Sequence, residues 1–409
     1  MLLSPGEMPG MAPKDKPKAS MAGLAWQMIR HNPGMIRTVL REEYRRRWGI
    51  SLDRRYRQGF SSPPVSLNLN LTRRCNLKCR MCEQHRHQPR SSTTTLSWYD
   101  PARELPLASW QDLLDQVASF RPRLYLTGGE PLLYPHFPEL IREAKKRRFV
   151  LHLQTNGTLL DRAADQLVAA GVEMVTVSLD GPAEIHDRIR GQQGAFRRSQ
   201  EGIAALVAAR GGRATPLLLI NCVISKANVS VLGQMVPLAL ELGADILQLQ
   251  HTIFNTPDNV ARHNRWLSPE FVQNQGLDLV TPSLPEGEYY ESEITGEDLP
   301  RLRAGLEEAQ RRAQGRLRLQ VLPNLPAGLL ASYYLDLHYP FPQVCQALWK
   351  SCPILPDGTV SHCLHLVAGN IAHQPFREIW NGPQMQRFRQ LVSRRLFPGC
   401  ARCCSRNFT

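Results

Sequence analysis

Residues 66–82 read SLNLNLTRRCNLKCRMC, and this stretch decides the fold. Leucine alternates with a small polar residue through Ser66–Leu71, which predicts a β-strand with one buried face. Three cysteines follow directly, with the spacing Cys-x3-Cys-x2-Cys, at Cys75, Cys79 and Cys82. Three thiolates so close together can hold a cubane iron–sulfur cluster and leave its fourth iron open. Zinc is the alternative, with His85 or His87 as the fourth ligand.

Strand and helix then alternate as far as residue 251. Strands are predicted at Ser66–Leu71, Arg123–Thr127, Phe149–Thr155, Glu173–Leu179, Leu217–Ile224 and Ile246–His251. Amphipathic helices are predicted between them, at 107–120, 136–147, 159–170, 195–210 and 228–242. This alternation predicts a parallel sheet built from right-handed crossovers. Polar residues inside the strands, such as Gln154, Asn221 and Gln248, indicate a barrel with a ligand cavity.

A second motif follows the second strand and reads Leu126-Thr127-Gly128-Gly129-Glu130-Pro131. Its two glycines allow the backbone to approach a ligand closely. The carboxylate of Glu130 can accept hydrogen bonds from a ligand ammonium group. Because barrel sites lie at the carboxyl ends of the strands, we expect this turn to line the site.

Together these residues resemble the radical S-adenosylmethionine (radical SAM) superfamily, over about residues 65–255. The resemblance implies an α/β fold, a partial (β/α)6 barrel of the TIM type, with a [4Fe-4S] cluster on the three cysteines and SAM chelated to the open iron. The residues that it assigns to SAM binding are Gly128, Gly129, Glu130, Asn156, Ser178 and Arg190. Glu130 and the glycine backbone would hold the SAM amino group, and Arg190 the carboxylate. Asn156 has a turn residue as its alternative role, since Asn-Gly is a common turn pair.

A second set of cysteines lies near the C-terminus. The pattern is Cys-x12-Gly-x4-Cys and then Cys-x2-Cys, formed by Cys345, Gly358, Cys363, Cys400 and Cys403. It resembles the SPASM/twitch extension, which implies one auxiliary [4Fe-4S] cluster on the four cysteines. Cys404 is an alternative to Cys403, and Cys352 to Cys345. A zinc knot with four cysteine ligands is the alternative to the cluster.

These features divide the chain into four parts. We expect a disordered tail and basic amphipathic helical segment at 1–60, the barrel at 61–255, an acidic insertion and linker at 256–335, and the small auxiliary-cluster domain at 336–409. The whole chain has 50 basic and 36 acidic residues, a net charge of +14. The basic helix, within 24–48, fits either a membrane surface or its own domain. We expect the second, with the apolar side chains packed as core.

Clustered cysteines without a recognisable export signal predict metal ligation in a reducing compartment. No run of 18 apolar residues occurs, so a membrane-spanning helix is not expected. A cytoplasmic enzyme, with peripheral membrane contact as an open alternative, is therefore the expectation.

The resemblance implies a reaction. The enzyme would reductively cleave SAM to a 5′-deoxyadenosyl radical that abstracts a hydrogen from the substrate, with a reductant such as flavodoxin or ferredoxin as partner. His251, at the end of the sixth strand, is the expected catalytic residue. The SPASM-like tail favours a maturase of a peptide or protein. The alternative is a biosynthetic enzyme for a small molecule, lipid or cofactor precursor. An iron–sulfur electron carrier would not need the Gly-Gly-Glu turn, and no nucleic-acid partner is expected.

Overall fold

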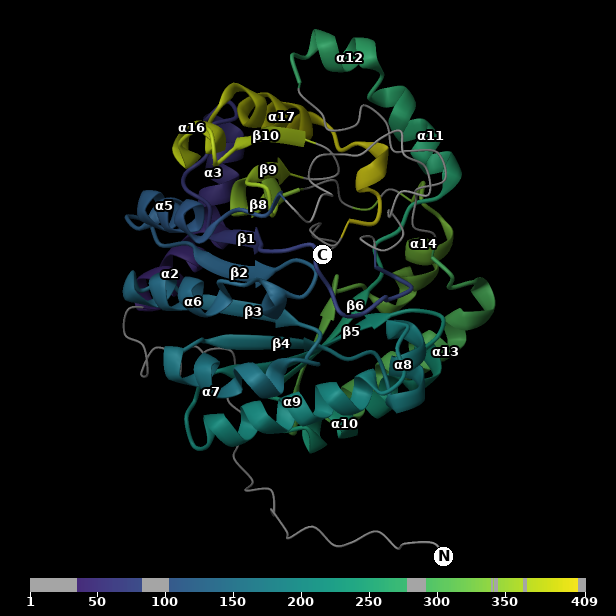
Figure 1. The fold of residues 1–409 in the computed structure, drawn as a ribbon. Helices are drawn as coiled ribbons and strands as arrows, with labels where there is room; N and C mark the ends of the chain where they lie inside the picture. The colour runs from purple at the N-terminus through teal and green to yellow at the C-terminus, as the bar shows by residue number, and fades with distance from the viewer. Residues whose placement is uncertain are drawn as a thin grey trace, which may run out of the picture.

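The computed structural model of the chain describes residues 35–82, 103–277, 292–339, 341, 345–362 and 366–403. One ten-stranded sheet crosses this part of the molecule, in the order β10-β9-β8-β1-β2-β3-β4-β5-β6-β7 (Figure 1). Its first seven strands are β1 (Ser66–Asn70), β2 (Arg123–Thr127), β3 (Leu151–Thr155), β4 (Met174–Ser178), β5 (Leu217–Ile224), β6 (Ile246–His251) and β7 (Arg318–Leu322). These seven are parallel and pair in sequence order. The partial α/β barrel expected from the sequence is confirmed, and β7 extends it by one strand.

Helices connect the strands, and those that cover one face of the sheet are α5 (Leu107–Val117), α6 (Phe137–Lys146), α7 (Leu160–Ala170), α9 (Ala195–Arg210), α10 (Met235–Glu241) and α13 (Leu299–Ala313). The other connecting helices are α8 (Ala183–Arg190), α11 (Pro257–Trp266), α12 (Pro269–Asn274) and α14 (Leu330–Leu335), of which α11 and α12 stand away from this layer (Figure 1). The covered face is the core, in which Leu69 and Leu126 are buried with Trp110 of α5. Successive side chains alternate between the two faces of a strand. The polar residues between the buried leucines therefore lie on the other, inner face.

The C-terminal residues join the same sheet. Strand β8 (Ser351–Ile354) pairs in parallel with β1, with Cys352 opposite Leu67. The antiparallel strands β9 (Thr359–His362) and β10 (Leu366–Asn370) complete the edge. Helices α15 (Ala347–Lys350), α16 (Phe376–Trp380) and α17 (Pro383–Arg394) accompany them. The auxiliary region therefore continues the barrel sheet.

Shorter helical turns refine the sequence prediction. The 3₁₀ turns are Pro131–Leu133, Val229–Gln234, Gly296–Asp298, Ala327–Leu329 and Pro398–Cys400. The helix predicted at 228–242 thus begins as a 3₁₀ turn before α10. Near the N-terminus, α2 (Met35–Tyr44) runs through a π-helical turn (Arg45–Gly49) into α3 (Ile50–Tyr56). Residues 24–34 of the predicted basic helix lie outside the described residues. No helix within the described residues is long and apolar enough to cross a membrane.

Candidate active site at the carboxyl ends of the strands

The three cysteines after β1 gather at one small apolar cluster. Cys79 is buried with Leu77 and Ala195, and Cys75 and Cys82 pack against them. Burial raises the pKa of the Cys75 thiol to about 11, and the neighbouring Cys79 and Cys82 thiols act in the same direction. Each thiolate makes ionisation of its neighbours less favourable, because the negative charges repel. A bound metal cation offsets this repulsion, so the three cysteines can bind it as thiolates. The donor set therefore fits an iron–sulfur cluster, which takes cysteine thiolates as its ligands. His85 and His87, the further ligands of the zinc alternative, lie outside the described residues.

The Gly-Gly-Glu turn supports the base of the cysteine loop. Gly129 N donates to Thr72 O at 2.7 Å, and Glu130 N donates to Arg74 O at 2.8 Å. A Cβ at Gly128 would lie 2.5 Å from Thr72 O, and one at Gly129 would lie 2.3 Å from Arg74 O. The two glycines thus allow close approach of the chain's own backbone. From the sequence we expected this close approach to serve a ligand, and the structure adds a local reason for both glycines.

The Glu130 carboxylate is fully buried and ties the turn to the end of β3. Its Oε1 accepts from Thr155 Oγ1 at 2.8 Å and from Leu132 N at 3.2 Å, and its Oε2 accepts from Asn156 N at 2.9 Å. Burial raises the pKa of Glu130 to about 7, although these three donors act to lower it. A cationic group beside this carboxylate would favour its charged form. The site thus offers a buried anion near the cysteine loop.

Asn156 contacts the cysteine loop with its side chain. Its Nδ2 donates to Asn76 Oδ1 at 2.9 Å, and its Oδ1 accepts from Thr158 N at 2.9 Å. Asn76 Nδ2 in turn donates to Thr158 Oγ1 at 2.8 Å. The amide of Asn156 is therefore committed to the loop between Cys75 and Cys79. The geometry supports a positioning role for this residue, which the sequence analysis placed among the SAM contacts.

Arg190, at the end of α8, contacts a cysteine of the loop. Its Nη1 lies 3.7 Å from Cys79 Sγ, and its Nη2 lies 2.6 Å from Asp180 Oδ2. Burial acts to lower the pKa of Arg190, but Asp180 and Cys79 raise it above its ordinary value. Asp180 is itself buried and accepts from Val223 N at 3.0 Å. The guanidinium is thus held between Asp180 and a cysteine of the loop, and these two contacts account for its position without a SAM carboxylate.

The inner face of the sheet carries a row of amide and hydroxyl side chains. Tyr125 Oη donates to Gln154 Oε1 at 2.7 Å, and Gln154 Nε2 donates to Ser178 Oγ at 2.7 Å. Two strands further on, Gln248 Nε2 donates to Asn221 Oδ1 at 2.8 Å. Ser178 and Asn221 are register neighbours, so the row runs from β2 to β6. Ser178, expected at SAM, lies within this row at the carboxyl end of β4.

His251 does not lie on this inner face. His251 is two residues after Leu249 in β6, so both side chains point to the covered face, and His251 is 1% exposed. Its Nδ1 lies 2.6 Å from Tyr334 Oη, and burial lowers its pKa to about 4. The geometry therefore does not support a catalytic His251. Gln250, the preceding residue of β6, takes the place on the inner face, as strand alternation alone would indicate.

The structure brings two of the C-terminal cysteines together. Burial raises the pKa of the Cys345 thiol, and the nearby Cys403 thiol acts in the same direction. Cys400 precedes Cys403 by one turn, with Cys403 N donating to Cys400 O at 3.3 Å. Cys352 lies apart in β8, fully buried in the sheet core. The geometry thus favours Cys345 over Cys352, while Cys363 and Cys404 lie outside the described residues.

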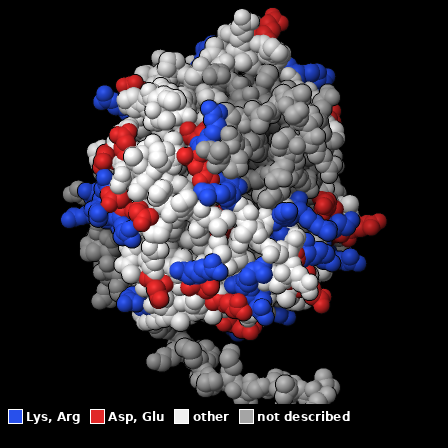
Figure 2. Space-filling view, viewed as in Figure 1, with Lys and Arg blue, Asp and Glu red and all other residues white. Residues whose placement is uncertain are grey.

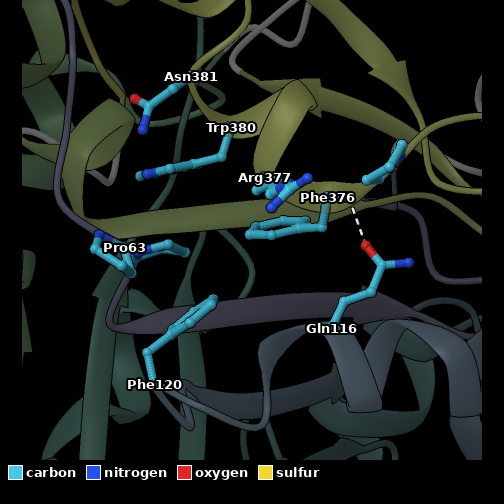
Figure 3. Close-up of a pocket in the computed structure, with 9 residues that line it drawn as sticks. Pro63, Gln116, Phe120, Phe376, Arg377, Trp380 and Asn381 are labelled. Atoms are coloured by element: carbon cyan, nitrogen blue, oxygen red, sulfur yellow. Dashed lines mark hydrogen bonds between the residues drawn. The ribbon is translucent and has the colours of Figure 1, made fainter.

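A cavity of ≈ 480 Å³ lies at the opposite end of the barrel (Figure 3). Phe120, Phe376 and Trp380 line it, with Pro63 beside them. Phe120 precedes β2, so this cavity is at the end where the strands begin. The cysteine loop follows β1 at the other end. This cavity is therefore not where the cysteine chemistry takes place.

Comparison with known proteins gives the family. The radical SAM superfamily matches residues 69–221, and an iron–sulfur cluster-binding domain, SPASM, matches residues 345–404. An AdoMet-dependent heme synthase of Methanosarcina barkeri is 31% identical over 347 residues, which cover 81% of this chain and 86% of that protein. A PqqA peptide cyclase of Ruegeria pomeroyi is 29% identical over 328 residues, covering 78% and 74%.

Solved structures of low sequence identity share the fold. Streptococcus suis SuiB bound to precursor peptide SuiA superposes with a TM-score of 0.55 at 15% identity, covering 82% of this chain and 68% of that chain. The protein anSMEcpe with bound AdoMet and Cp18Cys peptide gives 0.52 at 19% identity, covering 83% and 86%.

Fold and cysteine loop together define an iron–sulfur enzyme built on an α/β barrel. The chain belongs to the radical SAM superfamily and carries a C-terminal SPASM domain.

Proposed function

We propose that this enzyme is a maturase that modifies a peptide or protein substrate by radical SAM chemistry. The observation that carries the proposal is the row of side chains on the inner face. Gln154, Ser178, Asn221 and Gln248 are neutral and offer both donors and acceptors. A peptide backbone presents the matching N–H and C=O groups. The PqqA peptide cyclases among the relatives support the same substrate class.

The site residues divide into a cluster part and a substrate part. Cys75, Cys79 and Cys82 would hold a [4Fe-4S] cluster whose open iron binds SAM. When bound, this group supplies the electron that cleaves SAM and starts the radical reaction. Glu130 would hold the SAM ammonium group by charge, because its buried carboxylate lies near Cys75. Arg190 holds Cys79, and the neutral inner face positions the substrate and excludes water.

The C-terminal cysteines would hold the auxiliary cluster. Cys345, Cys363, Cys400 and Cys403 supply four thiolates, a closed set that suits electron transfer or structure. A one-electron donor such as flavodoxin or ferredoxin would reduce the enzyme. Thiolate ligands in such number suit a reducing compartment, which supports a cytoplasmic enzyme.

The heme synthase relative motivates a second candidate, a biosynthetic enzyme acting on a small cofactor precursor. A substrate rich in carboxylates would favour cations on the inner face. The arginine at the start of β2, Arg123, is instead paired with Glu42 at 2.5 Å. Arg318 of β7, two residues before Gln320, does place one cation on the inner face. The experiment below therefore separates the two candidates.

The deciding experiment is anaerobic reconstitution with iron and sulfide, followed by product analysis. We expect 5′-deoxyadenosine to form together with a mass change in a peptide encoded beside this gene. A porphyrin precursor converted under the same conditions, with peptides unchanged, would establish the second candidate. Gln248→Ala serves as a site variant, and it should lower the ratio of product to 5′-deoxyadenosine while SAM cleavage continues. Gln384→Ala, in α17 and away from the inner face, is its control.

A further inference from the structure

Seven large apolar side chains stand exposed in one regular series near the N-terminus. They recur at every fourth position: Ile36, Leu40, Tyr44, Trp48, Leu52, Tyr56 and Phe60. Leu40 is 63% exposed, Trp48 64% and Tyr56 68%. From the sequence we expected the apolar side chains of this helix to pack as core, and for Ile36, Leu40 and Tyr44 that expectation is wrong. We call the seven residues the apolar stripe.

The π-helical turn keeps the apolar stripe on one side. An α-helix turns about 100° per residue, so a four-residue step overshoots a full turn by about 40°. Five such steps, from Ile36 to Tyr56 at the end of α3, would in a regular helix carry the side chains around more than half of the circumference. A π turn takes up more residues per turn, and here it spans Arg45–Gly49, in the middle of the stripe. The wider turn therefore offsets the drift between Tyr44 and Leu52.

Another side of the same helix is anchored to the barrel. Arg45 Nη2 donates to Trp349 O at 2.8 Å, while its Nη1 pairs within the helical segment with Asp53 at 2.5 Å. Arg41 donates to Pro64 O at 2.8 Å and also to Phe120 O. The helix is thus fixed in place, and its apolar stripe is turned away from the contacts that hold it.

The charge of the helix indicates what the apolar stripe contacts. Residues 35–60 contain eight arginines and three acidic residues, a net charge of +5. All three acids are engaged by arginine: Glu42 by Arg123, Glu43 by Arg47 and Asp53 by Arg45. Elsewhere, on the face drawn in Figure 2, acidic side chains neighbour the basic ones. A second copy of the chain would bring two such cationic helices together, which like charge opposes.

We infer that the apolar stripe docks the enzyme on an anionic lipid surface. Tyr and Trp rings suit the headgroup level of a bilayer, and apolar side chains flanked by arginine are the pattern of a helix that lies in the interface. Pro64 and Phe120, which Arg41 contacts, precede β1 and β2. The helix therefore lies at the end of the barrel where the strands begin. The radical site at the other end stays open to its substrate while the enzyme is docked.

Flotation with lipid vesicles tests this inference on the full chain. Vesicles of phosphatidylcholine and phosphatidylglycerol in equal parts should carry the protein, vesicles of phosphatidylcholine alone should not, and added salt should weaken the binding. The triple variant Leu40→Ser, Trp48→Ser, Tyr56→Ser removes three exposed side chains and spares Arg41 and Arg45. Its partition into the mixed vesicles should fall about a hundredfold or more.

Leu335→Ser is the matched control, because Leu335 is 52% exposed but lies in α14, outside the apolar stripe. It should float like the wild type, and all variants should keep the wild-type melting temperature. Absence of flotation at low salt would overturn the inference. A protein that is dimeric in analytical ultracentrifugation, and monomeric in the triple variant, would overturn it in favour of a second copy.

Discussion

Arg190 points its Nη1 at Cys79 Sγ from 3.7 Å, so the positive charge of α8 reaches a cysteine of the cluster loop. Asp180 holds the guanidinium from the other side, at 2.6 Å. Hydrogen bonds to the sulfur ligands are one of the means by which proteins set the potential of an iron–sulfur cluster. We therefore expect the Arg190–Asp180 ion pair, next to the end of β4, to influence the reduction potential of a cluster bound at Cys79.

Arg190→Lys is the first prediction. The shorter ammonium group cannot keep both contacts, so the iron content should stay near wild type while the reduction potential falls and SAM cleavage slows by roughly tenfold. Anaerobic redox titration and 5′-deoxyadenosine assays measure the two effects. Arg188→Lys, on the exposed side of α8, is the control and should change neither. An unchanged potential in Arg190→Lys would show that the contact is structural.

The second prediction concerns the hydrogen bond between Asn156 and Asn76. Asn156→Ala leaves the backbone N–H to Glu130 in place but removes the amide that holds the cysteine loop. Loss of this partly buried bond should cost about 0.5–1.5 kcal/mol in the free energy of unfolding, and the loop cluster should be lost more readily. Asn76→Ala should do the same. The double variant should cost less than the sum of the two, because they share one interaction.

Much of the barrel could be predicted because its signals are local. The strand at Arg123–Thr127 was predicted with its observed bounds, since alternating or wholly apolar runs bounded by turns specify strands directly. The pairing of β8 with β1 could not be predicted, because it joins short strands about 280 residues apart and depends on tertiary contacts. The place of His251 could have been found, since it shares parity with Leu247 and Leu249. The exposure of Leu40 could not have been predicted, because the sequence pattern of an apolar helix face is the same whether or not another element covers it.

Glu130→Gln carries the third prediction. If the carboxylate holds the SAM ammonium group, SAM affinity should fall about tenfold to a hundredfold. The structure adds a second consequence. Thr155 Oγ1 and Asn156 N both donate to this carboxylate, so a glutamine NH₂ would face a donor and lower stability by about 1–3 kcal/mol. Glu139→Gln, on exposed α6 surface, is the control for both. If Glu130→Gln bound SAM with the wild-type affinity, Glu130 would not be part of the SAM site.

Iron content gives the fourth prediction. Two cubane clusters imply about eight irons per chain, and Cys75→Ala, Cys79→Ala, Cys82→Ala should leave about half with no SAM cleavage. Cys345→Ala should lower the iron content of the auxiliary cluster, which accounts for the other half. Cys352→Ala separates ligation from packing, because Cys352 is buried in β8 among core residues. It should keep all the iron while lowering the melting temperature. Loss of iron in Cys352→Ala, and its retention in Cys345→Ala, would reverse the assignment.

The fifth prediction uses the buried histidines. Burial lowers the pKa of His251 to about 4 and that of His152 to about 3, whereas an unfolded histidine has a pKa of about 6.5. These two histidines thus bind fewer protons in the folded protein than in the unfolded chain between these values. Their contribution to stability is present above pH 6.5 and is lost as the pH falls toward 4. For His251 alone the full loss is about 3 kcal/mol, from a difference of about 2.5 pKa units.

His251→Gln should remove this part of the acid sensitivity. Glutamine retains a polar group for Tyr334 Oη but has no proton to bind, so the free energy of unfolding should vary less between pH 7 and pH 5 than in the wild type. Urea unfolding at both pH values measures the difference. His338→Gln is the control, because His338 is exposed on the surface beside Asp258. An unaltered pH slope in His251→Gln would mean that His251 takes up its proton in the folded state, and that its pocket admits water.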